Sequence, residues 1–513
     1  MPTLTERHAA AAKTLAAVGQ SHVLKFYDEL NDAQRDQLLS QVEGIDWPEA
    51  GRLINSHVLN TPPLHLPKNI EPAPCYANVP TDENAGRYRE ARALGEKLLS
   101  EGMVAAFTVA GGQGTRLGWD APKGTFPATP ITGRPLFGVL ADYILKAQDK
   151  FGSVIPWYVM TSPTNHGPTV AFFKENDYFG LEPRNVKHFS QAMMPAIGLN
   201  GAQRGKVLLA AKDSLALSPN GHGGSLKALH ASGAIDDMKK RGVSQISYTQ
   251  IDNPTVHVVD PLFIGLHALD GAQMSSKMLP KTGPKEKLGN FCLADGKMTV
   301  IEYSDLPDEL AHQTTPNGEL RFRAGSIAIH MIEVGFVEDL STSPEGFALP
   351  FHRAEKKVPC IDPDTAKPIE PTSPNAVKLE TFVFDALPLC ETSILYETDR
   401  VEEFAPIKNA DEPGAVDCPA TSKQLQTERA ARWLEKHGIK IPRNADGKVD
   451  AKIEISCLTA IGPDDLAGVD LPIAIQAGGS VKRSFARRTR FTYREIKTRD
   501  VIAGFVCCVA MYG

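Results

Sequence analysis

The segment Val104-Ala-Ala-Phe-Thr-Val-Ala-Gly-Gly-Gln-Gly-Thr-Arg-Leu-Gly118, followed by Pro122-Lys-Gly124, decides the fold of this chain. Its apolar first part, residues 104–109, is typical of a buried strand. Four glycines follow between positions 111 and 118. Because glycine has no side chain, the backbone amides of such a loop can approach an anion closely. The segment therefore predicts a strand that leads into a polyphosphate-binding loop.

Two better-known phosphate loops do not fit this segment. A dinucleotide-binding fingerprint would need a glycine three places after Gly114, where Leu117 stands. This mismatch disfavours an oxidoreductase. A P-loop would need Gly-Lys-Ser or Gly-Lys-Thr, whereas Lys123 precedes Gly124 here. What remains is a glycine loop with one fixed cation, Arg116, and Lys123 further along. The alternative is a tight turn with two solvated bases, which the density of glycines disfavours.

Beyond the loop, short apolar runs alternate with helical patterns. We expect strands at 104–109 and 156–161, and helices at 136–150 and 169–176. Such alternation predicts an α/β fold with a Rossmann-like core and a mixed, mostly parallel sheet, whose ligands bind beyond the C-terminal ends of the strands. Further strands are predicted at the segments 245–251 and 382–384.

The two ends of the chain differ from this central body. Residues 1–97 are predicted to form a helical N-terminal segment that includes a Pro-rich surface link at 61–74, and a helix at 83–101 leads into the first strand. Residues 98–403 form the central domain. We assign residues 404–513 to a small C-terminal domain. It contains a helix at 422–437 and a tail from Lys452 onward that favours strands.

The bulk composition limits the partners of the chain. It has 513 residues with 55 basic and 61 acidic side chains, a net charge of −6, so nucleic acid and anionic membranes are not expected as partners. No apolar run is long enough to span a membrane, and Met1 to Arg7 lack a signal-peptide core. We expect a cytoplasmic protein, either a monomer or a weak homo-oligomer.

The glycine loop resembles the signature loop of the eukaryotic-type UDP-sugar pyrophosphorylases, and most of all the branch that uses N-acetylglucosamine 1-phosphate. The resemblance continues in order to Ala410. It includes the segments His188–Ala196, Pro219–Gly224, Ile251–Asn253, Asp260–Gly265, Val300–Ser304, Ala324–Ile327, Lys356–Pro359, Lys378–Asp385 and Phe404–Ala410. None of these is specific alone, but together and in order they are.

The resemblance implies that the central domain is a nucleotidyltransferase catalytic domain. It implies a Mg²⁺-dependent uridylyltransferase that joins UTP and a hexose 1-phosphate by in-line attack on the α-phosphate, giving UDP-sugar and pyrophosphate. Positioning and electrostatics do most of the work in such a reaction. Arg116 would stabilise the departing pyrophosphate and Lys123 the triphosphate. The remaining phosphate oxygens would bind the amides of Gly111, Gly112, Gln113 and Gly114.

Asp252 is the candidate ligand for Mg²⁺. It follows the predicted strand 245–251 and precedes Asn253, and it matches the metal aspartate of the family. Mg²⁺ typically takes one or two protein carboxylates together with phosphate oxygens. The plainer interpretation of Asp252-Asn-Pro254 is a turn that closes a strand.

The resemblance also assigns the base and the sugar. Gln191 matches the glutamine that faces uracil, and Gly221 a backbone contact to the same ring. Lys408 matches a lysine that reaches the sugar phosphate from the C-terminal region. The residues placed around the hexose are Gly289, Glu302, Tyr303, Phe382 and Phe384. Without the family, Phe382 and Phe384 would be interpreted as core residues of a strand.

Two positions on the sugar side depart from the N-acetylhexosamine pattern. Ser326 and His222 each stand where those enzymes usually carry asparagine, and the Gly-His-Gly step resembles the UDP-glucose and broad-range branches. N-acetylglucosamine 1-phosphate remains the leading acceptor, with glucose or galactose 1-phosphate as the alternative. A nucleotide-sugar-binding protein without turnover is a second alternative. The presence of both Arg116 and Lys123, groups aimed at a leaving pyrophosphate, disfavours it.

Overall fold

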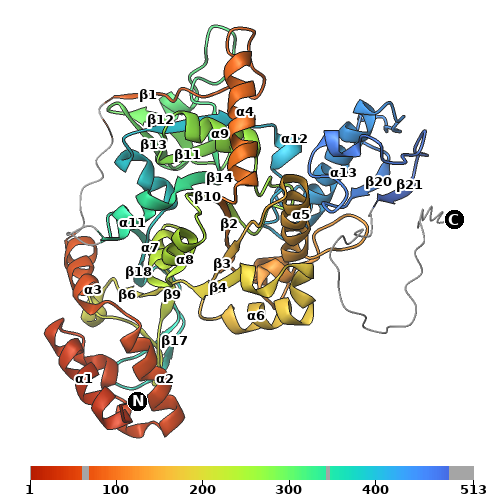
Figure 1. Cartoon of the computed structure of the whole chain (residues 1–513). Coiled ribbons are helices and arrows are strands. Elements are labelled where there is room, and N and C mark those ends of the chain that lie inside the picture. The colour runs from red at the N-terminus through yellow and green to blue at the C-terminus, as the bar shows by residue number, and fades with distance from the viewer. Residues whose placement is uncertain (1, 61–66, 68, 343–346, 484–513) are drawn as a thin grey trace, which may run out of the picture.

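The computed structural model describes residues 2–60, 67, 69–342 and 347–483. At its centre lies a ten-stranded mixed sheet (Figure 1). Four of its strands run parallel in the order β10 (Gln245–Gln250), β2 (Val104–Val109), β3 (Trp157–Thr161) and β4 (Val186–Ser190). The antiparallel strand β14 (Ala324–Glu333) pairs with β10 and connects this parallel part to the rest of the sheet. The predicted α/β class is confirmed.

The other strands of this sheet are β1 (Ile70–Pro72), β11 (Met274–Pro280), β12 (Asn290–Ala294), β13 (Lys297–Ile301) and β19 (Ser393–Glu397). Smaller sheets contain β5 (Met193–Pro195), β6 (Ile197–Gly198), β7 (Leu209–Ala211), β8 (Ser214–Leu215), β9 (Leu217–Pro219), β15 (His352–Lys356), β16 (Cys360–Ile361), β17 (Pro368–Ile369), β18 (Ala376–Glu380), β20 (Ala451–Ile455) and β21 (Gly479–Arg483). The helices are α1 (Leu4–Ala17), α2 (Asp32–Glu43), α3 (Trp47–Leu53), α4 (Ala85–Ser100), α5 (Leu136–Phe151), α6 (His166–Glu175), α7 (Gly224–Ala231), α8 (Ala234–Lys240), α9 (Pro261–Leu269), α10 (Asp308–Ala311), α11 (Val334–Thr342), α12 (Arg400–Glu403) and α13 (Pro419–Lys436).

Most elements predicted for the core are present, but one is wrong. The segment 382–384 is not a strand, because Phe382 precedes a 3₁₀ helix, Val383–Leu389. Strand β18 ends at Glu380, and the backbone beyond it bonds to the glycine turn at 220–223 instead of to a neighbouring strand. Thr381 N–H donates to the carbonyl of Asn220, and Thr381 O accepts from the N–H of Gly223 at 2.8 Å.

The Pro-rich link and the C-terminal tail are described only in part. Residues 61–66, 68 and 484–513 lie outside the described residues. Within the link, Ile70–Pro72 forms β1, an edge strand that pairs with β12, which the sequence did not predict. Proline, which has no backbone N–H, is tolerated there because an edge strand need not donate hydrogen bonds on its outer side. In the tail, β20 and β21 form a parallel pair.

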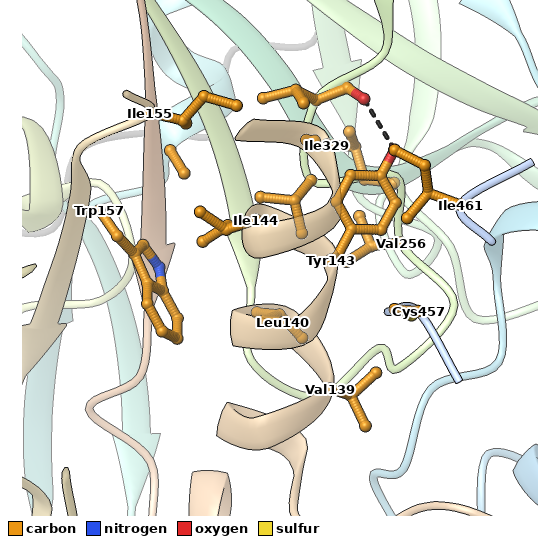
Figure 2. Packing of buried hydrophobic residues seen from close by; sticks show 14 of the residues in the cluster. Val139, Leu140, Tyr143, Ile144, Ile155, Trp157, Val256, Ile329, Cys457 and Ile461 are labelled. Carbon is orange, nitrogen blue, oxygen red and sulfur yellow. Dashed lines mark hydrogen bonds between the residues drawn. The ribbon is translucent and has the colours of Figure 1, made fainter. Parts of the chain in front are cut away.

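The core around α5 holds the central sheet against the C-terminal region. Figure 2 shows Val139, Leu140, Tyr143 and Ile144 of this helix, with Trp157 on the sheet side. Tyr143 is buried, and its hydroxyl donates to the carbonyl of Val259 at 2.8 Å, the bond dashed in Figure 2. This bond satisfies the one polar group that the buried ring carries into the core.

The helices of the N-terminal segment pack together as a cluster of their own. Leu15 from α1 and Leu38 and Leu39 from α2 are fully buried. The same cluster includes Leu209 and Leu215, which belong to the small strands β7 and β8 of the central domain. The segment is therefore docked on the central domain through apolar contacts.

The C-terminal region meets the central domain beside α5 (Figure 1). The carboxylate of Glu454 in β20 accepts hydrogen bonds from the N–H groups of Ile131 and Thr132, at 2.7 and 2.9 Å, and from the Thr132 hydroxyl. A cavity of about 400 Å³ lies at this junction, between the loop 129–135, α13 and β20. None of the site residues predicted from the sequence lines it.

Within the described residues, no helix is long and apolar enough to cross a membrane.

Two glycines allow α4 and α9 to pack closely. A Cβ added to Gly265 would lie 1.6 Å from the carbonyl oxygen of Ala91, and one added to Gly95 would lie 1.8 Å from that of Pro261. These obstacles are backbone atoms, so they cannot move aside as a side chain could. The absence of a side chain at both positions therefore sets the distance between the two helices.

We predict that Gly265→Ala lowers the free energy of unfolding by about 1 to 3 kcal/mol, because an extra methyl group is forced between two packed backbones. Gly167→Ala on α6 is the matched control, since nothing lies within 4 Å of a Cβ there. Guanidinium chloride unfolding followed by circular dichroism measures both variants. Equal unfolding midpoints for the two would contradict this account of the helix contact.

Candidate active site

The glycine loop begins where β2 ends and is held in place by a buried asparagine. The side-chain amide of Asn165 donates to the carbonyls of Ala110, at 3.0 Å, and Gly112, at 3.2 Å. Across the loop, the N–H of Lys123 donates to the Gly112 carbonyl and the N–H of Gly114 to the Ala121 carbonyl. Gly118 has φ +68°, the left-handed region that favours glycine. The loop is therefore closed on itself, with Lys123 at its far end.

The two predicted cations of the loop have different surroundings. Arg116 is exposed, and its guanidinium forms no hydrogen bond or ion pair with any residue in the described part of the chain. Lys123 is mostly buried, and its ammonium lies 3.4 Å from Oδ2 of Asp252. Because β2 and β10 are parallel neighbours with Val109 paired to Gln250, the residues after both strands emerge at the same sheet edge. The structure thus brings Lys123 and Asp252 together.

The segment that carries Lys408 also reaches this edge. The N–H of Ile407 donates to the backbone carbonyl of Asp252 at 2.9 Å. The N–H of Lys408 donates to the carbonyl of Asp417, a residue whose φ of +55° is unusual for a non-glycine residue. Burial raises the pKa of the Asp417 carboxyl, and the nearby charge of Lys408 opposes that rise. The backbone at Lys408 therefore lies close to Asp252, although Lys408 belongs to the C-terminal region.

Gln191 lies against the glycine loop from the end of β4. Its side chain is buried, and its Oε1 has no hydrogen-bond partner among the described residues. A Cβ added to Gly111 would lie 2.6 Å from Nε2 of Gln191, so a side chain at position 111 would displace this amide. A buried unpaired amide oxygen is costly. A donor from a bound molecule would satisfy this oxygen.

The glycine turn at 220–223 is pressed against the segment after β18. Gly221 has φ +65°, and a Cβ there would lie 2.4 Å from the carbonyl oxygen of Thr381. The Nδ1 atom of His222 accepts a hydrogen bond from the N–H of Val383 at 3.1 Å. In the neutral ring the proton is therefore on Nε2. Burial lowers the pKa of His222 to about 4, so the ring is neutral at physiological pH.

Aromatic rings gather around His222. Its ring centroid lies 5.3 Å from that of Phe382 and 5.5 Å from that of Phe384, and the two phenyl rings stack on each other at 5.1 Å. The ring of His352 lies 4.7 Å from Phe382, and its Nε2 bonds to Oδ2 of Asp385 at 2.8 Å. That bond raises the pKa of His352. Phe382 and Phe384 thus face a histidine cluster and not a strand interior.

Three of the predicted sugar residues meet beside β12, β13 and β14. Gly289 directly precedes β12, Glu302 directly follows β13, and Ser326 lies in β14. A Cβ added to Gly289 would lie 3.6 Å from Oε1 of Glu302 and 3.8 Å from Cβ of Ser326. Burial raises the pKa of Glu302 above its usual value, and the nearby charge of Asp305 adds to that rise. Tyr303 is 46% exposed and points away from the core. The contacts therefore group Gly289, Glu302 and Ser326 and leave Tyr303 at the surface.

An irregularity in β14 lies next to Ser326. The pairing with β11 shifts register between Ser276 and Met278, and Ala328 has φ +55°. Such bulges redirect side chains and often lie beside functional sites. The bulge ends the regular alternation of β14 two residues after Ser326.

Sequence reasoning missed several residues of this region. Asn165 lies 53 positions from the carbonyl of Gly112 that it holds, and His352 belongs to an exposed edge strand. Asn220 is buried with an unpaired Oδ1. It lies within the glycine turn, so the Pro219-Asn-Gly-His-Gly-Gly224 motif was a signal that could have included it.

The carboxylates near Lys123 fit a magnesium ion. Asp252 is only partly buried, and its charge helps to raise the pKa of the nearby Asp417 carboxyl. One or two carboxylates with open positions for phosphate oxygens are the donor set that Mg²⁺ takes in such sites.

A second group, His257, Asp260 and Glu403, has its ligand atoms within 4.8 Å of one another. The Lys277 ammonium already lies 2.7 Å from both of those carboxylates, so this group is an ion network and not a metal site.

A phosphate-type glycine loop at the C-terminal edge of a parallel core, with cations and a carboxylate beside it, defines an α/β nucleotidyltransferase. A model of the family described as UTP–glucose-1-phosphate uridylyltransferase matches residues 77–446. The chain belongs to this family. These matches confirm the resemblance to UDP-sugar pyrophosphorylases, which the glycine loop and the later motifs indicate.

Individual relatives cover most of the chain. The UDP-N-acetylhexosamine pyrophosphorylase-like protein 1 of Xenopus tropicalis is 35% identical over 432 residues, which are 82% of this chain and 83% of that protein. The UDP-N-acetylglucosamine pyrophosphorylase of Saccharomyces cerevisiae is 32% identical over 85% of this chain and 93% of that protein. Among solved structures, the uridine diphosphate N-acetylglucosamine pyrophosphorylase from Trypanosoma brucei, in complex with an inhibitor, superposes with a TM-score of 0.78. It is 26% identical, covering 93% of this chain and 98% of that chain.

Proposed function

We propose that this protein transfers the uridylyl group of UTP to N-acetylglucosamine 1-phosphate, releasing pyrophosphate. One observation carries the proposal: Lys123 at the end of the glycine loop lies 3.4 Å from Asp252, at the edge where β2 and β10 end. A cation and a carboxylate so close to free loop amides suit a metal-bound triphosphate. The names of the relatives, which are pyrophosphorylases for N-acetylated sugars, support the choice of acceptor.

The phosphates of UTP would lie along the loop. The amides of Gly111, Gly112 and Gln113 would bind phosphate oxygens, and the side chain of Gln113 is exposed. The N–H of Gly114 already donates to the carbonyl of Ala121 and is not free for a phosphate, contrary to the prediction from the sequence. Arg116 has no partner among the described residues. It would bind the β- and γ-phosphates and stabilise them as they depart as pyrophosphate. Lys123 would neutralise charge nearer Asp252. These donors act on charge that develops in the transition state, where electrostatic stabilisation has its largest effect.

Asp252 would hold Mg²⁺, with Asp417 as a second carboxylate nearby. The bound ion would neutralise part of the triphosphate charge and so ease the approach of a second anion. Lys408 would hold the phosphate of the sugar in line with the α-phosphate. The attacking oxygen is already ionised at neutral pH, so the protein needs no general base.

Gln191 would recognise uracil. Its unpaired Oε1 can accept from the imide N–H of the base, and its Nε2 can donate to a carbonyl of the base. Cytosine presents no imide N–H and would leave the buried amide oxygen unsatisfied, which disfavours CTP. Gly221 would contribute a backbone contact to the same ring, as its close packing on Thr381 keeps the turn fixed.

The sugar would lie between two groups of residues. Glu302 and Ser326, on either side of Gly289, would bind hydroxyl groups or the N-acetyl group, and Tyr303 would cover the outer side. Phe382, Phe384 and His222 would form an aromatic cluster against the sugar, with ring centroids 5.1 to 5.5 Å apart. Glucose or galactose 1-phosphate is the second candidate acceptor. His222 favours it, because an Nε2–H donor replaces the asparagine amide expected in the N-acetylhexosamine branch.

A cytoplasmic location, a monomeric or weakly associating state and the absence of nucleic-acid and membrane partners stay predictions from the sequence.

We predict that Arg116→Ala and Lys123→Ala each lower turnover by about 100-fold or more, because each removes a charge that acts on the transition state. Pyrophosphate release from UTP and N-acetylglucosamine 1-phosphate, with Mg²⁺ and with EDTA, measures this. Lys174→Ala, an exposed lysine on α6, is the matched control. Both site variants turning over like the control would refute the assignment of the loop. A parent protein that binds UDP-sugar without releasing pyrophosphate would point to the non-catalytic alternative.

We predict that Ser326→Asn raises the preference for N-acetylhexosamine phosphates over plain hexose phosphates, because an amide can both donate to and accept from an acetamido group. The measurement is the ratio of kcat/KM values for N-acetylglucosamine 1-phosphate and glucose 1-phosphate. Ser304→Asn, at an exposed position two residues beyond Glu302, is the control. An unchanged ratio for Ser326→Asn would remove this residue from acceptor selection.

A further inference from the structure

A fully buried lysine links three parts of the chain behind the candidate active site. The ammonium of Lys277 in β11 lies 2.7 Å from Oδ2 of Asp260 and 2.8 and 2.7 Å from the two carboxylate oxygens of Glu403. Lys277 and Glu403 are 1% and 0% exposed. Buried charges are tolerated only when they are paired and hydrogen-bonded. The position of Glu403 is therefore tightly fixed.

Further donors complete the surroundings of the Glu403 carboxylate. The hydroxyl of Thr398 donates to Oε2 at 2.7 Å, and the N–H of His257 donates to Oε1 at 3.2 Å. The carboxylate is thus bonded to the segment after Asp252 as well as to Lys277. Any displacement of Glu403 would leave several buried groups unpaired at once.

The backbone next to Glu403 is bound to the residue that follows Asp252. The side-chain amide of Asn253 donates to the carbonyl of Glu403 at 2.7 Å, and its Oδ1 accepts from the N–H of Ala405 at 3.0 Å. Two residues further on, Ile407 N–H donates to the carbonyl of Asp252. Three hydrogen bonds therefore join the segment 403–407 to Asp252 and Asn253, and Lys408 follows directly.

We propose that Asn253 and Glu403 are positioning residues that hold Asp252 and Lys408 in one fixed arrangement. This inference rests on the proposed function, in which Asp252 binds the metal and Lys408 the sugar phosphate. The two groups come from parts of the chain more than 150 residues apart, and neither is fixed to the other by its own side chain. Misplacing reacting groups by about 1 Å can lower turnover by about 100-fold.

Asp260 provides a matched comparison within the same ion network. It binds Lys277, and its Oδ1 accepts from the N–H of Leu262 to cap α9. In the described part of the chain, no hydrogen bond joins it to the segment 403–408. Asp260→Asn would remove one charge from Lys277 but keep a good capping side chain. It disturbs the network without disturbing the link to Asp252.

The experiment compares the parent protein, Asn253→Ala, Glu403→Gln and Asp260→Asn. Three quantities are measured for each: the Kd of UTP by calorimetry with EDTA in place of Mg²⁺, kcat for pyrophosphate release at saturating substrates in Mg²⁺, and the thermal unfolding midpoint. For Asn253→Ala we expect kcat to fall by about 100-fold while the Kd of UTP stays within about threefold, because the glycine loop and Gln191 are untouched. For Asp260→Asn we expect a lower unfolding midpoint and a kcat within about threefold of the parent.

The outcomes separate this inference from the proposed function. A parent protein without pyrophosphate release overturns the function itself. If the parent is active and Asn253→Ala keeps its kcat, the positioning role is wrong. It is also wrong if Asn253→Ala and Asp260→Asn lose kcat equally, since that is what general destabilisation gives. If Asn253→Ala does not fold, Glu403→Gln decides: a kcat lowered by about tenfold at unchanged Kd for UTP supports the role, and an unchanged kcat overturns it.

Discussion

The parallel pairing of β2 with β10 is the constraint on which the site depends. Their register sets Val109 opposite Gln250, so the glycine loop and Asp252 leave the sheet at the same edge. Lys123 can then approach Asp252, and Asn165, at the N-terminus of α6, can hold the loop from the other side. An antiparallel pair would send the two loops to opposite edges, and strands far apart in the sheet would keep the loops apart. The order and direction of the strands therefore bring the site residues together, and the individual side chains then supply the proposed chemistry.

The elements that carry the loop could be predicted because their patterns are local. Residues 104–109 form a run that is apolar except for Thr108, and α5 has a long apolar face, so both appear where the sequence indicates them. The same holds for Asp252, which directly follows a predicted strand. The glycine loop was recognisable because its glycine spacing distinguishes it from a dinucleotide fingerprint, and the order of Lys123 and Gly124 distinguishes it from a P-loop.

What could not be predicted depends on contacts between distant segments. Phe382 and Phe384 alternate as strand residues would, but the glycine turn bonds to the backbone of Thr381 and Val383 beside them, and a 3₁₀ helix follows. His222 of that turn lies 161 positions before Val383. The burial of Lys277 could not be predicted either, because its partner Glu403 lies 126 positions away in the sequence. Alternation and composition report on neighbours in the sequence. They do not report on which distant carboxylate will neutralise a buried ammonium.

The account makes one central claim, that the triphosphate lies on the glycine loop between Arg116 and Asp252. A crystal structure of the protein with UTP and Mg²⁺ tests it most directly. The account predicts phosphate oxygens within hydrogen-bond distance of the amides of Gly111 to Gln113, a metal on Asp252 and uracil against Gln191. UTP found in the cavity between α5 and α13, with an empty loop, would contradict it.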